Sequence, residues 1–196
     1  APSAQYTVTD EGASSVPGGF VRSVDELSVT FTPDDDLCPS ETYTVDVAGV
    51  SAAGDGFQFT PFQSTFTTEA AASPVAVTFR TTVPTFTPVG STVYLSGNTP
   101  LLGDNVIASA AAMTYNGIDG VWEVTVNLTE CDEVTVFHSR GSAGTIETDG
   151  PTGFDPALHV VTVVDDGSGT QVVDLTVENW EDVIVTDVSP ADDAAQ

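Results

Sequence analysis

The chain has 196 residues, enough for one large or two small domains with a buried core, and 40% of them are hydrophobic. It carries 29 acidic residues against three arginines and no lysine, which gives a formal net charge of −26 at pH 7. This charge excludes nucleic acid and anionic membranes as partners because both need a basic footprint, and the sequence has no apolar run long enough for membrane insertion.

The cysteines and the first residues indicate a secreted, extracellular or cell-surface protein. The chain opens with Ala-Pro-Ser-Ala-Gln and no initiator methionine, as expected of a mature protein after signal cleavage or of a fragment. Cys38 and Cys131 lie in acidic turns where free thiols would be a liability outside the cell, so we expect a Cys38–Cys131 disulfide. An intermolecular disulfide and two free thiols stay open as alternatives. Asn127 begins an Asn-Leu-Thr sequon and is a candidate for glycosylation.

The first 72 residues are predicted to form short β-strands. Apolar and polar residues alternate with period two, Val and Thr dominate, and no stretch has a helical period. Turn signals rich in Gly, Pro and Asp separate the strands. The alternating groups are Tyr6 and Val8; Leu27, Val29 and Phe31; Tyr43, Val45 and Val47; and Phe57 to Phe66.

A linker of small residues at 69–74, Glu-Ala-Ala-Ala-Ser-Pro, predicts a domain boundary. We therefore expect an all-β protein with two tandem antiparallel β-sandwiches, at 1–72 and 73–180, and an acidic extension at 181–196. Residues 109–113 have the composition of a single helical turn, too short to stand alone. The strands predicted in the second domain are 75–80, 92–96, 120–128, 133–139, 144–148, 158–164 and 170–177.

The segment Leu37-Cys38-Pro39-Ser40-Glu41-Thr42-Tyr43 has the spacing of a tyrosine corner, in which the tyrosine hydroxyl bonds back to the upstream backbone. With the strands on either side of this motif, residues 5–68 resemble the bacterial Ig-like domains of surface-layer and adhesin proteins. The resemblance implies a β-sandwich whose first one or two strands have no counterpart here. A string similar to the family's opening strand occurs instead at 185–194, Val-Thr-Asp-Val-Ser-Pro-Ala-Asp-Asp-Ala.

An Ig-like unit without its first strand has an unpaired edge and an apolar acceptor slot. We predict that the carboxyl-terminal strand of the next copy fills this slot, as in donor-strand complementation. Two alternatives stay open: the tail begins the next module of a longer protein, or it closes the slot of its own chain. The predicted slot residues are Tyr6, Val8, Leu27, Val29 and Phe31. The predicted donor residues are Val183, Ile184, Val185 and Val188.

Three motifs follow one another in the second half: Val93-Tyr-Leu-Ser-Gly97, Pro100-Leu-Leu-Gly-Asp104 and Val121-Trp-Glu-Val-Thr-Val-Asn-Leu128. In their order and spacing they resemble the starch-binding domain, the family 20 carbohydrate-binding module. The resemblance implies an antiparallel β-sandwich that binds α-glucan by stacking sugar rings on Trp and Tyr.

The residues of the family's two glycan sites are partly retained. Asn105 and residues 146–149 stand where the family places the two stacking tryptophans of its principal site. Of the second site's aromatic residues, Tyr115 has a clear equivalent and Phe86 a looser one. The resemblance therefore implies a glycan contact at Phe86 and Tyr115.

The sequence offers few groups for catalysis or metal binding. The acidic runs 34–36 and 165–166 lie in predicted turns and are expected to form a solvated face. They lack EF-hand spacing, and Ca²⁺ binding stays an alternative. His138 and His159 are expected to be ordinary sheet residues, and no nucleophile motif surrounds them. We predict no enzyme activity, no metal site and no cofactor.

Two functional hypotheses follow. The first is a structural subunit of an extracellular assembly (a filament, surface layer or adhesin stalk) that self-associates into a homopolymer by strand donation. The alternative is a pair of α-glucan-binding modules from a larger secreted glycan-active protein, with a polysaccharide as partner. The missing stacking tryptophans and the free tail strand favour the first hypothesis.

Overall fold

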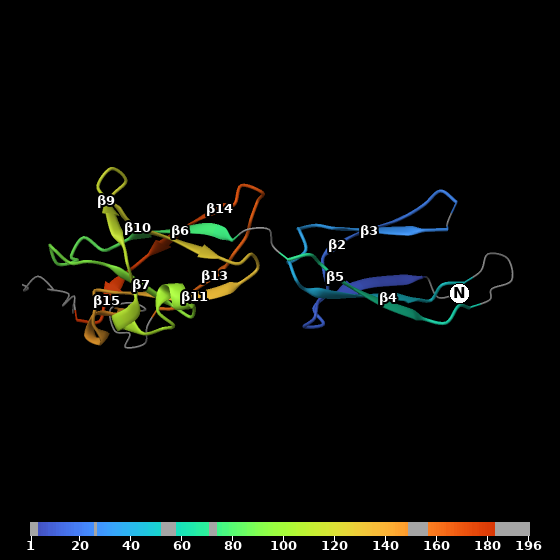
Figure 1. Ribbon diagram of the computed structural model, residues 1–196, viewed down its shortest axis with the longest axis horizontal. Helices are drawn as coiled ribbons and strands as arrows, with labels where there is room; N and C mark the ends of the chain where they lie inside the picture. The colour runs from blue at the N-terminus through green and yellow to red at the C-terminus, as the bar shows by residue number, and fades with distance from the viewer. Residues whose placement is uncertain (1–3, 26, 52–57, 71–73, 149–156, 183–196) are drawn as a thin grey trace, which may run out of the picture. The chain divides into compact units, whose positions relative to one another are not determined.

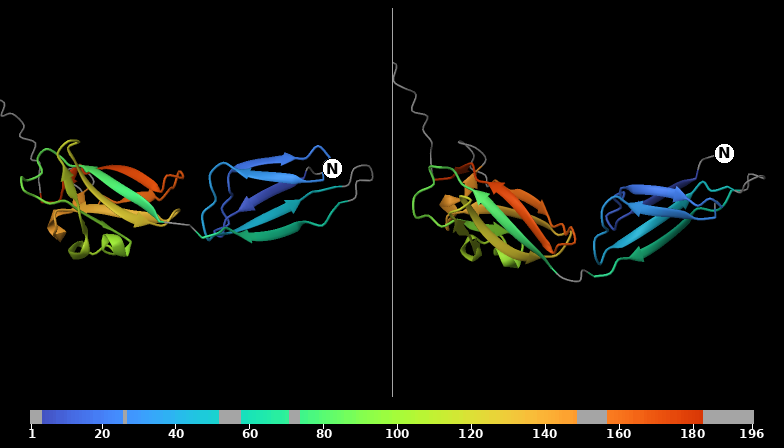
Figure 2. Two further views of the ribbon diagram at one scale, coloured as in Figure 1. Left: turned by 45° about the horizontal axis from the view of Figure 1, so that its top comes forward. Right: turned by 90° about the horizontal axis from the view of Figure 1, so that it is seen from above.

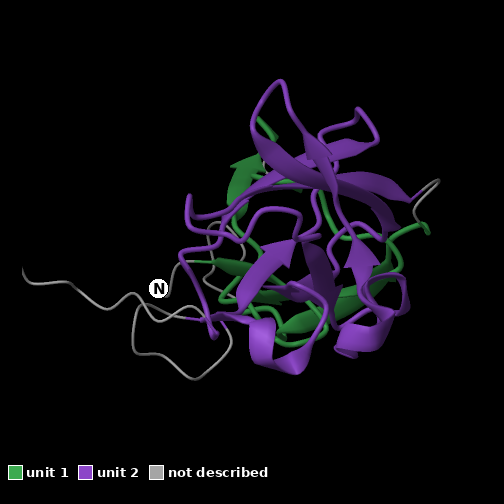
Figure 3. Ribbon diagram, turned by 90° about the vertical axis from the view of Figure 1, so that its left-hand side faces the viewer, with its two compact units in different colours: residues 1–72 green, residues 73–196 purple. Residues whose placement is uncertain are grey.

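The computed structural model describes residues 4–25, 27–51, 58–70, 74–148 and 157–182 (Figure 1). The chain divides into two compact units, residues 1–72 and 73–196 (Figure 3). Every regular element of the described residues is a β-strand or a short 3-10 helix, which confirms the all-β prediction. None of these helices has the length and apolarity needed to cross a membrane.

The first unit has a three-stranded antiparallel sheet and a separate hairpin (Figures 1 and 2). The sheet has the order β1-β4-β5, and β2 pairs with β3. Val8 and Tyr43 are buried, whereas all six residues of β5 are exposed, so this unit has a small core. The bounds are β1 Gln5–Thr9, β2 Gly18–Arg22, β3 Val29–Pro33, β4 Thr42–Ala48 and β5 Phe62–Thr67.

The predicted tyrosine corner is present at the start of β4. The Tyr43 hydroxyl accepts a hydrogen bond of 2.9 Å from the backbone N–H of Cys38. The hydroxyl of Thr68 donates to the Cys38 carbonyl at 2.6 Å, and the Tyr43 ring stacks on Phe66 with centroids 5.5 Å apart. These contacts tie the loop before β4 to both strands of the β4–β5 pair.

The second unit has two four-stranded sheets (Figures 1 and 2). One sheet has the order β14-β6-β10-β9, in which β14 and β6 are parallel and the other pairs antiparallel. The other has the order β13-β11-β7-β8, and β12 pairs with β15. The bounds are β6 Val75–Thr82, β7 Tyr94–Gly97, β8 Ala111–Ala112, β9 Thr114–Asn116, β10 Val121–Leu128, β11 Glu133–Ser139, β12 Glu147–Thr148, β13 His159–Thr162, β14 Thr170–Thr176 and β15 Asn179–Trp180.

The core of the second unit follows from the alternation of its strands. In β6 every second side chain is buried, because successive residues of a strand point to opposite faces. These side chains pack with inward residues of both sheets into one cluster. Its fully buried members include Val75, Val77, Phe79, Val93, Leu95, Leu102, Val134, Val136 and Val163, with Trp180 1% exposed.

The local structure differs from the sequence prediction at residues 109–113. The predicted helical turn is wrong: a 3-10 helix at Ile107–Ser109 is followed by the short strand β8. Gly103 precedes this segment with φ +83°, and a Cβ there would lie 2.6 Å from the Ser109 carbonyl oxygen. The close approach of backbone to backbone therefore decides the conformation, which local composition could not indicate.

Candidate functional site

Tyr115 on β9 and Trp122 on β10 form an aromatic pair in the second unit, with Tyr115 exposed and Trp122 half-buried. The two residues are cross-strand partners, so their side chains share one face of the sheet. Their ring centroids are 5.4 Å apart with a tilt of 53°. Because β9 is an edge strand, the Tyr115 side chain is 55% exposed, whereas Trp122 packs partly against the core. This pair offers an anchored aromatic ring to solvent.

A charged network holds the hairpin that carries Tyr115. Arg80 on β6 lies between Glu123 on β10 and Asp174 on β14, with N–O distances of 3.2 and 3.5 Å. Its guanidinium also contacts Asp119 in the β9–β10 turn at 3.3 Å, and the Asn116 amide donates to both Asp119 and Glu123. Glu123 follows Trp122 in β10 and so points to the opposite face, which leaves the Tyr115 ring unobstructed by the network.

The other residue of the predicted glycan contact is Phe86, which is exposed in the loop between β6 and β7. Asn105 is exposed and has φ +63° in the loop after the first 3-10 helix, Pro100–Leu102. Trp180 is a core residue, with its indole N–H donating to the Thr87 hydroxyl at 3.0 Å and the Arg140 guanidinium over its ring. A glycan contact at Phe86 and Tyr115 stays a prediction.

In the first unit, an apolar groove of about 360 Å³ opens between the hairpin and the sheet. Four of the five predicted slot residues line it, namely Tyr6, Leu27, Val29 and Phe31. The fifth, Val8, is 2% exposed and belongs to the core beneath. The predicted donor residues, Val183, Ile184, Val185 and Val188, lie outside the described residues.

The remaining predicted site residues are placed as follows. Both Cys38 and Cys131 are disulfide-bonded, so the alternative of free thiols is wrong. That the bond joins these two residues within one chain stays a prediction. Asn127 lies on β10 with an exposed side chain, and its glycosylation also stays a prediction.

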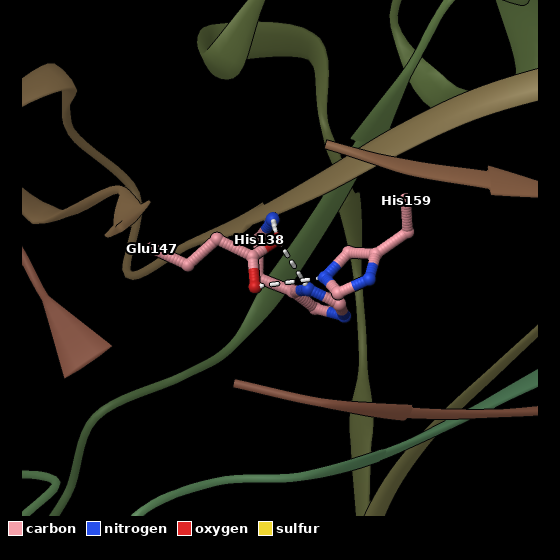
Figure 4. Close-up of side chains that lie close together, drawn as sticks. All are labelled: His138, Glu147 and His159. Carbon is pink, nitrogen blue, oxygen red and sulfur yellow. Dashed lines mark hydrogen bonds and ion pairs between the residues drawn. The ribbon is translucent and has the colours of Figure 1, made fainter. Parts of the chain in front are cut away.

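One group in the described part of the chain could hold a metal ion. His138 on β11, Glu147 on β12 and His159 on β13 place their ligand atoms within 4.8 Å of one another (Figure 4). Burial raises the pKa of Glu147, but hydrogen bonds with His138 and His159 outweigh burial and lower that pKa below its ordinary value. The sequence prediction treated both histidines as ordinary sheet residues, since they stand 21 positions apart and nothing local marks Glu147 as their common partner.

Comparison with known proteins gives a family match for the first unit and relatives that match part of the chain. Residues 1–68 match the family of bacterial Ig-like domains. The chain is 36% identical over 107 residues to an alpha-amylase of Niallia circulans, an alignment that covers 55% of this chain and 8% of that protein. It is 35% identical over 119 residues to an amylopullulanase of Thermoanaerobacter thermohydrosulfuricus, covering 61% of this chain and 8% of that protein. The chain thus spans only a small part of these relatives.

The carboxyl-terminal region resembles the starch-binding modules of amylases. One such solved structure is the family 20 module of a maltotetraose-forming amylase from Pseudomonas saccharophila. It has 20% sequence identity and a TM-score of 0.37, and the match covers 52% of this chain and 99% of that one. Both resemblances noted in the sequence, Ig-like and starch-binding, are therefore confirmed.

These findings correct the leading functional hypothesis. A self-polymerising structural subunit is wrong, because the relatives are an alpha-amylase and an amylopullulanase. The apolar groove does exist, but it is no evidence of strand donation: an Ig-like unit with only five described strands leaves apolar side chains uncovered whatever its biological task. The missing stacking tryptophans and the carboxyl-terminal tail, on which that hypothesis rested, do not distinguish a structural subunit from a glycan-binding module.

Proposed function

We propose that this protein is a non-catalytic α-glucan-binding segment of a larger, secreted, glycan-active protein. Its second unit is the binding module, and its Ig-like unit is a companion domain. The resemblance of the carboxyl-terminal region to starch-binding modules supports the ligand class. The disulfide-bonded state of both cysteines supports an oxidising, extracellular compartment.

The observation that carries this proposal is the exposed Tyr115 ring resting on Trp122. A flat aromatic face binds a sugar ring through its apolar C–H face, and a ring that is already immobilised loses little side-chain entropy on binding. The Tyr115 ring is held in place by the Trp122 ring, whose centroid lies 5.4 Å away, and by the pairing of β9 with β10. A single exposed ring is consistent with a weak site, with the affinity increased by other modules of a longer protein.

The proposed absence of catalysis rests on the placement of the carboxylates near Tyr115. Glycoside hydrolysis requires two carboxyl groups at a fixed separation across a cleft. The carboxylates nearest to Tyr115 in sequence, Asp119 and Glu123, are both engaged by Arg80 on the face opposite to the ring. They therefore serve the hairpin and are not placed for acid–base work on a sugar bound at Tyr115.

Affinity electrophoresis of the full chain in gels containing amylopectin tests the proposal. The wild-type protein is expected to be retarded, and Tyr115→Ala is expected to weaken binding at least about tenfold because the stacking face is lost. Phe62→Ala is the matched control, since Phe62 is also an exposed aromatic residue, 61% accessible, but lies on β5 of the Ig-like unit. Equal mobility of wild type and Tyr115→Ala at every polysaccharide concentration would refute the proposed site.

A further inference from the structure

Both histidines of the chain meet at one buried carboxylate inside the second unit (Figure 4). His138 is fully buried on β11, and Glu147 is 1% exposed on β12. His159 on β13 is opposite Val136 in the β11–β13 pair, which puts it diagonal to His138 on the same face of the sheet. Its side chain is 25% exposed, so one end of the group is accessible from solvent.

The three side chains converge from separate strands. One Glu147 carboxylate oxygen lies 2.8 Å from His138 Nδ1, and the other lies 3.1 Å from His159 Nε2. The imidazole rings are 5.7 Å apart and nearly perpendicular, at 76°. Donor atoms bound tetrahedrally to Zn²⁺ at 2.0–2.2 Å are about 3.3 Å apart. Two of the observed separations, 2.8 and 3.1 Å, are close to this value, and all the donor atoms lie within 4.8 Å of one another. The site can therefore close around a cation with side-chain shifts of up to about 1.5 Å.

The surroundings of the group also suit metal ligation. His138 Nε2 lies 2.8 Å from the hydroxyl of Thr81, and this hydroxyl can either donate or accept. His138 can therefore carry its proton on Nε2, donate it to the Thr81 hydroxyl and present a bare Nδ1 to a cation, since a histidine that binds a metal through one ring nitrogen usually donates a hydrogen bond through the other. The backbone N–H of His138 donates to Glu147 Oε1 at 2.6 Å and fixes the carboxylate.

Charge and donor type indicate which cation fits. Two imidazole nitrogens and one carboxylate are the donor set that Zn²⁺ and similar divalent transition metals take, with a fourth position left for water. Ca²⁺ prefers six to eight oxygen donors, and Glu147 supplies the only carboxylate of the group. A divalent cation also offsets a buried negative charge in a chain whose net charge is −26.

We propose that His138 Nδ1, the Glu147 carboxylate and His159 Nε2 form a binding site for Zn²⁺ or a similar divalent transition metal. The ion would tie β11, β12 and β13 together and stabilise this end of the sandwich. The proposal is independent of glycan binding, because none of the three residues belongs to the Tyr115 face.

NMR of the histidine rings in the full, EDTA-treated chain tests the proposal directly, because the protein has only two histidines to assign. Without metal, His138 is expected to carry its proton on Nδ1, since the Glu147 carboxylate can only accept. One equivalent of Zn²⁺ is expected to move this proton to Nε2 and to shift the His159 signals as well. Unchanged tautomers and shifts of both rings at excess Zn²⁺ would overturn the proposal without any need of a variant.

Calorimetry and thermal unfolding test Zn²⁺ binding in a second way, through affinity and stability. One Zn²⁺ per chain is expected to bind and to raise the melting temperature of the second unit, followed by the fluorescence of Trp122 and Trp180. His159→Gln keeps a hydrogen-bond donor for Glu147 but removes a ligand, so its Zn²⁺ affinity should fall by at least about tenfold. Asp166→Asn, an exposed acid in the β13–β14 loop, is the matched control and should bind as wild type. Equal binding by His159→Gln, or equal stabilisation by Ca²⁺, would assign the effect to surface acids and contradict the site.

Discussion

The tyrosine corner makes a quantitative prediction about the Ig-like unit. Tyr43→Phe keeps the ring and its stacking on Phe66 but removes the hydroxyl that accepts the N–H of Cys38. Tyr43 is 3% exposed, whereas Cys38 is only partly buried. Loss of this part-buried hydrogen bond is expected to lower the free energy of opening around β4 by about 1 kcal/mol.

Hydrogen exchange followed by mass spectrometry measures this loss, because both tryptophans lie in the other unit and their fluorescence does not report on β4. Peptides covering residues 37–48 should exchange faster in Tyr43→Phe, while fluorescence-detected unfolding of the second unit stays unchanged. Tyr6→Phe is the matched control, since the Tyr6 ring contacts Phe20 and Arg22 but its hydroxyl has no hydrogen bond in the described structure. Identical exchange in Tyr43→Phe and Tyr6→Phe would refute the argument.

The same corner has a pH dependence. Burial raises the pKa of the Tyr43 phenol, so the folded unit favours the neutral form. Its contribution to stability is therefore fully present below the ordinary phenol pKa of about 10 and is lost as the pH rises through the raised value. Wild type should show this loss in hydrogen exchange on the alkaline side, and Tyr43→Phe should not.

Two further predictions concern the backbone and the disulfide. Gly103→Ala should lower the free energy of unfolding of the second unit, measured in urea, by more than Gly120→Ala does. Both glycines have positive φ, where an alanine costs about 1–2 kcal/mol of backbone strain. Of the two, only Gly103 would also place its new Cβ against a backbone oxygen, at 2.6 Å. Equal effects would show that the loop can move aside. Peptide mapping without reduction should recover a single species that links Cys38 to Cys131 within one chain, and a disulfide-linked dimer would contradict the pairing.

The strand pattern of this protein was readable from sequence because its physical cause is local. Alternation in residues 75–80 and 133–139 predicted β6 and β11 closely, since burial of every second residue leaves a period of two. The tyrosine corner was readable for the same reason, because Cys38 and Tyr43 are five residues apart.

The site was less predictable, because it depends on pairing between distant segments. Tyr115 was identified by resemblance, but its support by Trp122 comes from the register of a three-residue edge strand that the sequence did not reveal. His138, Glu147 and His159 come together from β11, β12 and β13, and an antiparallel bridge between Ser139 and Ile146 brings β12 alongside β11. The predicted structural role is wrong for a different reason: the absence of the two tryptophans does not exclude a sugar site when the exposed Tyr115 ring is present.

Titration of the ¹⁵N-labelled full chain with maltoheptaose, followed by backbone NMR, tests directly whether this chain binds α-glucan at Tyr115. If the protein is an α-glucan-binding segment, saturable shifts should concentrate on residues 114–116 and 121–123, around Tyr115 and Trp122, and should vanish in Tyr115→Ala. Saturable shifts elsewhere that persist in this variant would move the site, and a spectrum unchanged at millimolar maltoheptaose would contradict glucan binding by this chain.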